Sequence, residues 1–339
     1  MNIHQWKAQV KLFNNQFDEH NEIKKQWNEN IEKNLHRFKK ELSIWNLEWL
    51  FYKKEKSVVV VGSSPSLKKD VEKLKELDDR FCIICANSVL KFLIRHDVIP
   101  DYCIAIDSDD IDIPQHLDID RDDVTLLAST VTCTEALDNW KGPIYYLPYY
   151  SVDKKIKTKV RRILGKAVPS GGNSMTEAMY IGTMIFGSRT LIFAGNEYCF
   201  DSVKKYYADD KAAKQEKMPV VYPIVDVLGR DRWTQPAHFL YAAWTEKIAI
   251  DLSPPGYFID TSFGILGRDK GSVIKVMELS EAIERVKWAL GEAKRLNEAK
   301  TDKARDKILK EIGGENDKSE VYRYNLQEHR DRLLQLARS

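Results

Sequence analysis

Two short runs of glycine, serine and asparagine in this sequence carry groups that bind phosphate. The first, residues 62–66 (GSSPS), follows the apolar run 58–61, and the second, residues 169–174 (PSGGNS), opens a later helical stretch. Backbone N–H groups at a helix start, together with nearby hydroxyl groups, receive anions. Ordinary capping of a helix is the alternative for each run. The candidate phosphate-binding residues are Gly62, Ser63, Ser64, Ser66, Ser170, Gly171, Gly172 and Asn173.

An Asp-x-Asp sequence follows the apolar run 102–106. Asp107 and Asp109 are candidates to hold Mg²⁺ against a nucleotide diphosphate, because hard cations prefer carboxylate oxygens. Five more aspartates lie between residues 112 and 123. A solvated acidic loop is therefore the alternative explanation.

Other polar side chains follow the apolar runs 81–85 and 190–194. Asn87 is placed either to hydrogen-bond a base or ribose or to cap the helix that follows. Tyr206 and Tyr207 come after the second run. Their phenols can donate hydrogen bonds to a departing phosphate, with aromatic packing as the alternative.

The elements that position these groups are strands alternating with helices. Continuous apolar runs such as 58–61 (VVVV) are typical of parallel strands that are buried on both faces. The pattern predicts an α/β fold: an open, mostly parallel, Rossmann-like sheet with helices on both faces. In such a sheet, ligands bind beyond the carboxyl ends of the strands, where the polar groups named above lie. Strands are expected at residues 58–61, 81–85, 102–106, 124–128, 144–147 and 190–194.

The pattern divides the chain into three parts, with helical extensions on both sides of a nucleotide-binding domain at residues 57–272. In residues 1–56, apolar and aromatic residues recur every three or four positions, which predicts one or two amphipathic helices. We favour packing of these helices on the domain over an oligomerisation role. Residues 273–339 are expected to be a helical scaffold or assembly surface, so both extensions are candidate contacts of a homo-oligomer.

Composition excludes several classes of protein. Acidic and basic residues nearly cancel, to a net charge of +2 over 339 residues, so no global field favours nucleic acid as a partner. The longest apolar stretch, residues 178–194, is broken at 187–189 (GSR) and does not predict a membrane span. The N-terminal sequence has no apolar signal core, and the five cysteines lie mostly in apolar runs. We expect a cytoplasmic protein with reduced thiols in its core.

The ordered series GSSPSL, ANS, PDYCIAID, SGGNS and IFAGNEY resembles one family of proteins. This family contains the flagellin-modifying motility accessory factors (Maf-type proteins) and the related archaeal 6-hydroxymethylpterin pyrophosphokinases. The similarity covers roughly residues 57–268, and it extends more distantly to bacterial sialyltransferases that use CMP-activated sugars. By this resemblance, Gly62 to Ser66 and Asn87 would line a nucleotide pocket, and Ser170 and Gly171 would face the donor phosphate.

The resemblance also implies roles for the residues after the last of these runs. Gly195, Asn196 and Glu197 would contact the nucleotide, and Tyr206 or Tyr207 would assist the leaving group. The sialyltransferases place a histidine base in the segment that matches residues 229–234, where this chain has Arg230. An arginine does not accept a proton near neutral pH.

The base must therefore be another residue, and three are candidates. His238 has the most suitable unperturbed pKa, whereas Glu197 lies closer to the expected phosphate site. Asp109 is the third candidate. We favour the two carboxylates together over His238, because a lone histidine beside a helix is commonly structural.

The resemblance implies a glycosyltransferase that moves a sugar, expected to be nonulosonic and CMP-linked, to a hydroxyl of a protein or glycan acceptor. The alternative is a Mg²⁺-dependent diphosphokinase that transfers pyrophosphate from ATP to a hydroxymethylpterin-like alcohol. A non-catalytic nucleotide-binding or assembly protein is the third hypothesis, motivated by the missing histidine.

Overall fold

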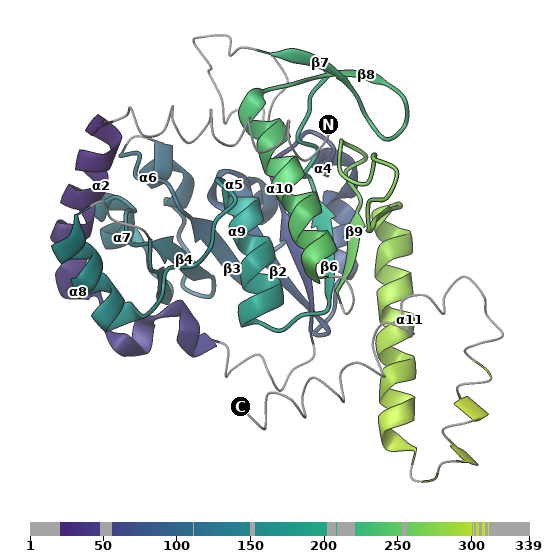
Figure 1. The fold of residues 1–339 in the computed structure, drawn as a ribbon. Coiled ribbons are helices and arrows are strands. Elements are labelled where there is room, and N and C mark those ends of the chain that lie inside the picture. Colours follow the sequence, from purple (N-terminus) through teal and green to yellow (C-terminus); the bar gives the residue numbers. More distant parts are fainter. Residues whose placement is uncertain are drawn as a thin grey trace.

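The centre of the molecule is one sheet of eight parallel strands (Figure 1). The computed structural model describes residues 21–47, 56–110, 112–149, 153–201, 208, 221–252 and 256–299, with a few positions between 301 and 311. The strands are β1 (Ser57–Val61), β2 (Phe81–Ala86), β3 (Tyr102–Ala105), β4 (Thr125–Ser129), β5 (Ile144–Leu147), β6 (Thr190–Ala194), β9 (Tyr257–Asp260) and β10 (Ile274–Val276).

The order of the strands, β10-β9-β6-β1-β2-β3-β4-β5, contains one reversal. Strands β1 to β5 follow one another toward one edge of the sheet. The chain then returns, β6 pairs with the free side of β1, and β9 and β10 extend the sheet the other way. The connections on the two sides of β1 therefore diverge, which opens a crevice at the carboxyl ends of β1 and β6.

Burial explains why these segments are strands. Every residue of β1 and β2 is buried, as expected for apolar runs covered on both faces. Helices α9 and α10 lie in front of the sheet and α4 and α5 behind it (Figure 1). The predicted α/β fold class is confirmed. The helices that follow the strands are α4 (Leu67–Asp70), α5 (Asn87–Arg95), α6 (Asp112–Leu117), α7 (Thr134–Asn139), α8 (Lys154–Leu164), α9 (Ser174–Tyr180), α10 (Pro236–Leu252) and α11 (Leu279–Glu298).

Some elements were not expected from the sequence. Strands β9 (YFID) and β10 (IKV) have four and three residues and each includes a charged residue, so neither contains a continuous apolar run of four residues. A separate antiparallel hairpin, β7 (Tyr222–Val225) and β8 (Asp231–Thr234), has a largely exposed surface, and a proline interrupts the apolar residues of β7. Strand β10 lies beyond residue 272, where we expected the sheet domain to end.

The N-terminal part packs on the sheet domain through side-chain amides. Helix α2 (Asn21–Asn34) is followed by short 3₁₀ turns at Leu35–Arg37, Lys40–Leu42 and Ile44–Asn46. Asn30 Nδ2 donates to the carbonyl oxygen of Val131 (2.9 Å), and Asn34 Nδ2 donates to that of Thr132 (2.9 Å). These bonds satisfy carbonyl groups in the loop after β4, which would otherwise be buried without a partner.

The expected helical break near residues 18–21 and the last helix at 319–337 fall wholly or largely outside the described residues. The five cysteines are buried thiols. Among the helices of the described ranges, none has both the length and the apolar composition needed to cross a membrane.

Replacement of Asn34 by alanine should lower the free energy of unfolding by about 1–3 kcal/mol, because the carbonyl of Thr132 would be left buried and unpaired. Chemical denaturation measures this change. The exposed Glu32 of the same helix is the matched control, and Glu32→Ala should change stability by less than about 0.5 kcal/mol. An unchanged midpoint for Asn34→Ala would contradict the assignment of these amides as the anchor of α2.

Candidate active site

The loops that leave β1 and β6 touch each other through their backbones. The N–H of Gly62 donates to the carbonyl oxygen of Ala194 (2.9 Å), and that of Ser64 donates to Gly195 (3.0 Å). A Cβ on Gly195 would lie 2.6 Å from the carbonyl oxygen of Gly62, and Gly195 has a φ of +67°. Both positions therefore require glycine for packing as well as for the turn.

Asn196 makes hydrogen bonds to groups at the ends of three strands. Its Nδ2 donates to the carbonyl oxygens of Val60 and Ala194 (3.0 Å each), and its backbone N–H donates to Ser262 Oγ (2.7 Å). The residue is buried, and within the described ranges its Oδ1 has no hydrogen-bond partner. The loop after β6 is thus held rigidly between the loops that follow β1 and β9.

Glu197 occupies the anion position at the start of α4. Its Oε2 accepts a hydrogen bond from the N–H of Ser66 (2.9 Å), and its own N–H donates to Ser64 Oγ (3.2 Å). A carboxylate is stabilised at a helix N-terminus for the same reason as a phosphate. Glu197 therefore takes the N–H of Ser66, which we had expected to be available to a ligand.

Glu197 has a second carboxyl group beside it. Burial raises the pKa of Glu197, against the opposing effect of its bond to Ser66. Burial also raises the pKa of the fully buried Asp260, at the end of β9, to about 7, and the charge of Glu197 adds to this shift. One Asp260 oxygen accepts a hydrogen bond from the N–H of Phe263 (3.1 Å).

The second glycine-rich turn caps helix α9 and lies against α10. Asn173 Oδ1 accepts the N–H of Thr176 (2.8 Å), and the Thr176 hydroxyl in turn accepts the N–H of Asn173 (3.3 Å), which completes a capping box. A Cβ on Gly171 or Gly172 would lie 2.6 Å from the ring of Trp244 or Tyr241, respectively. The glycines therefore allow α10 to approach the turn closely. The first N–H groups of α9, at Ser174 and Met175, remain available for an anion.

A pocket of about 160 Å³ lies between these two turns, at the reversal of strand order beside β1 and β6. Its lining is made of small polar groups and aromatic rings, and it contains no carboxylate among the described residues. The lining residues are Gly62, Ser63, Ser64, Ala86, Ser88, Asn173, Ser174, Met175, Gly195, Asn196, Tyr198, Cys199, Phe200 and His238.

Seven of the sequence-predicted site residues line this pocket, namely Gly62, Ser63, Ser64, Asn173, Gly195, Asn196 and His238. The remaining described candidates lie around it without lining it: Ser66, Asn87, Asp107, Asp109, Ser170, Gly171, Gly172 and Glu197. The side-chain nitrogen of Asn87 is hydrogen-bonded to His116 Nδ1 (3.1 Å), which directs it away from the pocket. Tyr206 and Tyr207 lie outside the described residues.

His238 is the histidine among the lining residues named above. It lies in the first turn of α10, with ring-centroid distances of 6.4 Å to Tyr198 and 6.2 Å to Tyr241. Burial lowers the pKa of His238 to about 4. The imidazole is therefore neutral at physiological pH and has a nitrogen able to accept a proton.

Asp107 and Asp109 follow β3, the strand beside β2, whose last residue Ala86 lines the pocket. Burial raises the pKa of Asp107, and the neighbouring charge of Asp109 adds to this shift. Asp109 Oδ1 accepts the N–H of Asp112 at the start of α6 (2.7 Å). No group of three or more His, Cys, Asp or Glu side chains gathers as a metal site in the described part of the chain. Two carboxylates suit Mg²⁺ where a nucleotide phosphate and water complete its coordination.

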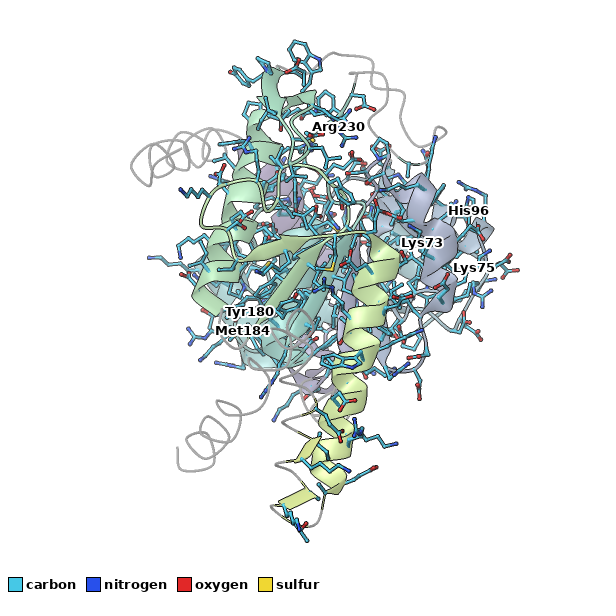
Figure 2. All side chains as sticks on the ribbon, turned by 90° about the vertical axis from the view of Figure 1, so that its right-hand side faces the viewer. Lys73, Lys75, His96, Tyr180, Met184 and Arg230 are labelled. Atoms are coloured by element: carbon cyan, nitrogen blue, oxygen red, sulfur yellow. The ribbon has the colours of Figure 1, made fainter. Side chains whose placement is uncertain are left out.

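The β7–β8 hairpin braces the loop that lines the pocket. Phe200 and Trp233 exchange two backbone hydrogen bonds (2.8 and 3.0 Å), and Thr234 Oγ1 donates to the carbonyl oxygen of Tyr198 (2.7 Å). The buried Asp226 accepts from Nε of Arg230 (2.6 Å) and of Arg232 (2.8 Å). Figure 2 shows Arg230 at the top of the molecule, at the same end as the hairpin in Figure 1. Arg230 thus stabilises the hairpin turn and does not line the pocket.

Glu177 is a buried acid one turn into α9. Its side chain is fully buried, and its carboxylate oxygens have no hydrogen-bond partner within the described ranges. Burial raises the pKa of Glu177 to about 8; Asp107 contributes to this shift, whereas the nearby Ser170 hydroxyl opposes it. Glu177 is therefore mostly protonated at neutral pH.

Comparison with known proteins places this architecture in a family. Residues 25–203 match the family described as 6-hydroxymethylpterin diphosphokinase MptE-like, which is more than half of the chain. The chain belongs to the MptE-like family. No curated protein matches it.

The fold of this MptE-like protein is found among solved structures. One example is a Maf glycosyltransferase from Magnetospirillum magneticum AMB-1, with a TM-score of 0.51 and 14% sequence identity. The similarity covers 75% of this chain and 44% of the Maf chain, so the MptE-like protein matches less than half of that relative. The suspected relationship to MptE-like and Maf-type proteins is confirmed at the level of family and fold.

Several lining residues of the MptE-like pocket were not predicted. Ser88 and Ser174 directly follow the candidates Asn87 and Asn173, so extending each polar run by one residue would have found them. Tyr198 and Phe200 carry no comparable signal, because an aromatic residue after a strand is as common in a core as in a site. Only their packing under the hairpin brings them to the pocket.

The contact between the β1 and β6 loops predicts that Gly62→Ala destabilises the protein. The added Cβ would meet the Gly195 carbonyl and lie 2.7 Å from Asn196 Oδ1, at a cost of about 1–3 kcal/mol. Equilibrium unfolding in denaturant measures this change. Gly291→Ala is the control, because a Cβ at Gly291 of α11 has no atom within 4 Å, and it should stabilise the helix by up to about 1 kcal/mol. Equal stability of the two variants would contradict the proposed close approach.

The free energy of unfolding of Glu177→Gln, measured relative to that of wild type, should increase as the pH rises from 5 to 8. The folded protein holds the Glu177 proton up to a pKa of about 8, whereas the unfolded chain releases it near the ordinary value. Wild type therefore loses stability over this range, by up to about 1.4 kcal/mol per pH unit. Denaturation at several pH values measures the difference, which should stay constant for the exposed control Glu284→Gln. A difference independent of pH for Glu177→Gln would refute the raised pKa.

Proposed function

We propose that this protein is a glycosyltransferase whose donor nucleotide binds in the pocket between β1 and β6. The observation that carries the proposal is the chemistry of the lining. Hydroxyl groups, amides and the start of α9 surround the pocket, and no carboxylate of the described residues faces into it. Such a lining binds a phosphate through neutral donors and does not repel it.

In the proposed reaction, the bond between the anomeric carbon of the sugar and the donor phosphate oxygen breaks. The electron pair leaves with the phosphate, whose charge the Ser63 and Ser64 hydroxyls and the N–H groups at the start of α9 stabilise. The acceptor hydroxyl oxygen bonds to the anomeric carbon, and its proton passes to a general base.

We propose His238 as that base, ahead of the two carboxylates that the sequence favoured. Its ring faces the pocket, whereas the Glu197 carboxylate caps α4 and the Asp109 carboxylate caps α6. A bound phosphate would raise the pKa of His238 from about 4, since a nearby negative charge favours the imidazolium form. The base would therefore be strongest when the donor is bound.

For this reaction we propose a CMP-linked nonulosonic sugar as the donor and a hydroxyl of a protein or glycan as the acceptor. This assignment is supported by the ordered motifs of the chain, by membership of the MptE-like family and by the shared fold with a Maf glycosyltransferase. Tyr206 or Tyr207 would assist the leaving phosphate.

The second candidate is a diphosphokinase, favoured by the family match itself. ATP would supply a pyrophosphoryl group to a hydroxymethylpterin-like alcohol. Asp107 and Asp109 would hold Mg²⁺, which supplies positive charge to the transferring phosphates. Their place at a strand end on the same edge of the sheet suits this role, although they do not line the described pocket.

His238→Gln should lower the release of CMP from a CMP-sugar donor by about 100-fold or more, while the affinity for CMP stays near that of wild type. A stopped nucleotide-release assay and isothermal titration measure the two quantities. His96→Gln is the matched control, because His96 is exposed at the end of α5 and pairs with Glu72, away from the pocket. Wild-type turnover in His238→Gln would remove His238 as the base.

Titration of the wild type with CMP, UDP and ATP, with and without Mg²⁺, distinguishes the hypotheses. Binding of CMP without metal supports the glycosyltransferase. Binding of ATP only with Mg²⁺, and its weakening in Asp109→Asn, would favour the diphosphokinase instead. Tight nucleotide binding without turnover of any donor would favour a non-catalytic protein.

A further inference from the structure

Helix α8 (Lys154–Leu164) has two chemically distinct faces. Ile156, Val160 and Leu164 recur every four residues and are buried against the domain. Asp153 caps the helix, and its Oδ1 accepts the N–H groups of Lys155 (2.7 Å) and Ile156 (3.0 Å). The helix is therefore fixed in orientation. Ile163 also packs against the core, whereas the lysines and arginines of α8 are exposed.

The outward face of α8 and the residues just after it are uniformly basic. Seven lysines and arginines lie between residues 154 and 166, and all of them are exposed. Asp153 is the one acidic residue of this segment, and it is engaged as the helix cap. The segment 153–166 has a net charge of +6, so the rest of the chain, with a total of +2, has a net charge of −4. The cations are Lys154, Lys155, Lys157, Lys159, Arg161, Arg162 and Lys166.

Within this segment the seven cations have one acidic neighbour, Asp153, whose charge interacts with those of Lys155 and Lys159. None of the salt bridges in the described part of the chain involves Lys154, Lys155, Lys159, Arg161 or Arg162. The surface also continues beyond the helix, because α8 packs on the turn Lys40–Leu42, where Lys39 and Lys40 are exposed beside Glu41. A surface with this excess of positive charge favours an external anionic partner.

The surface is held rigidly in place by the N-terminal part of the chain. Ser43 Oγ donates to the carbonyl oxygen of Leu164 (2.5 Å), and Trp45 Nε1 donates to that of Lys166 (2.8 Å). Figure 1 shows α8 beside α2 at one end of the molecule, opposite α11. The basic face is thus an outer side of the domain.

We propose that α8 is the docking face of this protein for a membrane of anionic phospholipids. Clusters of four to eight lysines and arginines on an amphipathic helix are typical of binding to anionic lipid head groups. No large apolar side chain of α8 is exposed, so the contact is electrostatic and reversible and does not insert into the bilayer. The inference does not depend on the reaction proposed above.

A nucleic acid is the competing polyanion, and the composition of the surface favours lipid. Segment 153–166 contains no aromatic residue on which a base could stack. The cations also lie along one convex helix rather than in a groove that follows a phosphate backbone. A flat array of head groups presents charge to such a helix along its whole length.

The full-length protein should sediment with vesicles of phosphatidylcholine and phosphatidylglycerol at low salt, and not with phosphatidylcholine alone. Lys155→Glu/Lys159→Glu/Arg162→Glu, which reverses one exposed stripe, should lower the partition coefficient at least ~10-fold. Lys270→Glu/Lys294→Glu/Lys307→Glu changes the net charge equally at dispersed exposed positions and should retain most of the binding. High salt should abolish binding of the wild type.

Circular dichroism and thermal unfolding establish that each variant is folded. A variant with glutamine at residues 155, 159 and 162 should bind the vesicles more weakly than wild type and more strongly than the triple glutamate variant. Absence of wild-type binding to the anionic vesicles at low salt would overturn the proposal. So would an equal loss of binding in the control variant, because net charge alone would then explain it. Tighter binding of duplex DNA than of vesicles at the same salt, lost in the α8 variant, would assign the surface to nucleic acid.

Discussion

The contact between Gly62 and Gly195 is the constraint on which the candidate site depends. Two backbones meet where the strand order reverses, and neither position has room for a Cβ. This contact joins the loops after β1 and β6, and both loops line the pocket. It therefore fixes the position of one side of the pocket relative to the other. The amide of Asn196 reinforces it by bonding to both strands at once. The lining residues Gly62 to Ser64, Gly195 and Asn196 all belong to the two loops that this contact joins.

Buried charge around the junction is organised so that the pocket itself stays neutral. Glu197 caps α4, Asp226 holds the two arginines of the hairpin, and Asp260 bonds to the loop behind them. These carboxylates therefore bond to backbone N–H groups and guanidinium groups, while hydroxyls, amides and one neutral imidazole line the pocket. This division suits a phosphate leaving group, since nearby uncompensated carboxylates would oppose its negative charge.

The basic helix α8, which we propose binds anionic lipid, lies on a different part of the domain from the pocket. It differs from the pocket in chemistry, since it presents exposed cations whereas the pocket is lined by neutral donors. Helix α2 bonds to the β4 loop through a side-chain amide, and Ser43 and Trp45 in the turns that follow it bond to the end of α8 and the residues just after it. The N-terminal part of the chain thus packs on the domain, as we expected.

The sequence alone predicted the parallel sheet and the edge at which the pocket lies, because long β-branched runs and glycine-rich turns are local signals. It also placed seven residues that line the pocket. It could not determine which groups of a turn face the ligand, since Asn87 turns to His116 while Ser88 lines the pocket, and Glu197 turns to α4. Those choices depend on contacts between separate segments: Asn87 and His116 are 29 residues apart, whereas Ser66 and Glu197, like Gly62 and Gly195, are more than a hundred residues apart. Strands β9 and β10 lack a continuous apolar run of four residues, so their pairing with β6 and with each other decided them.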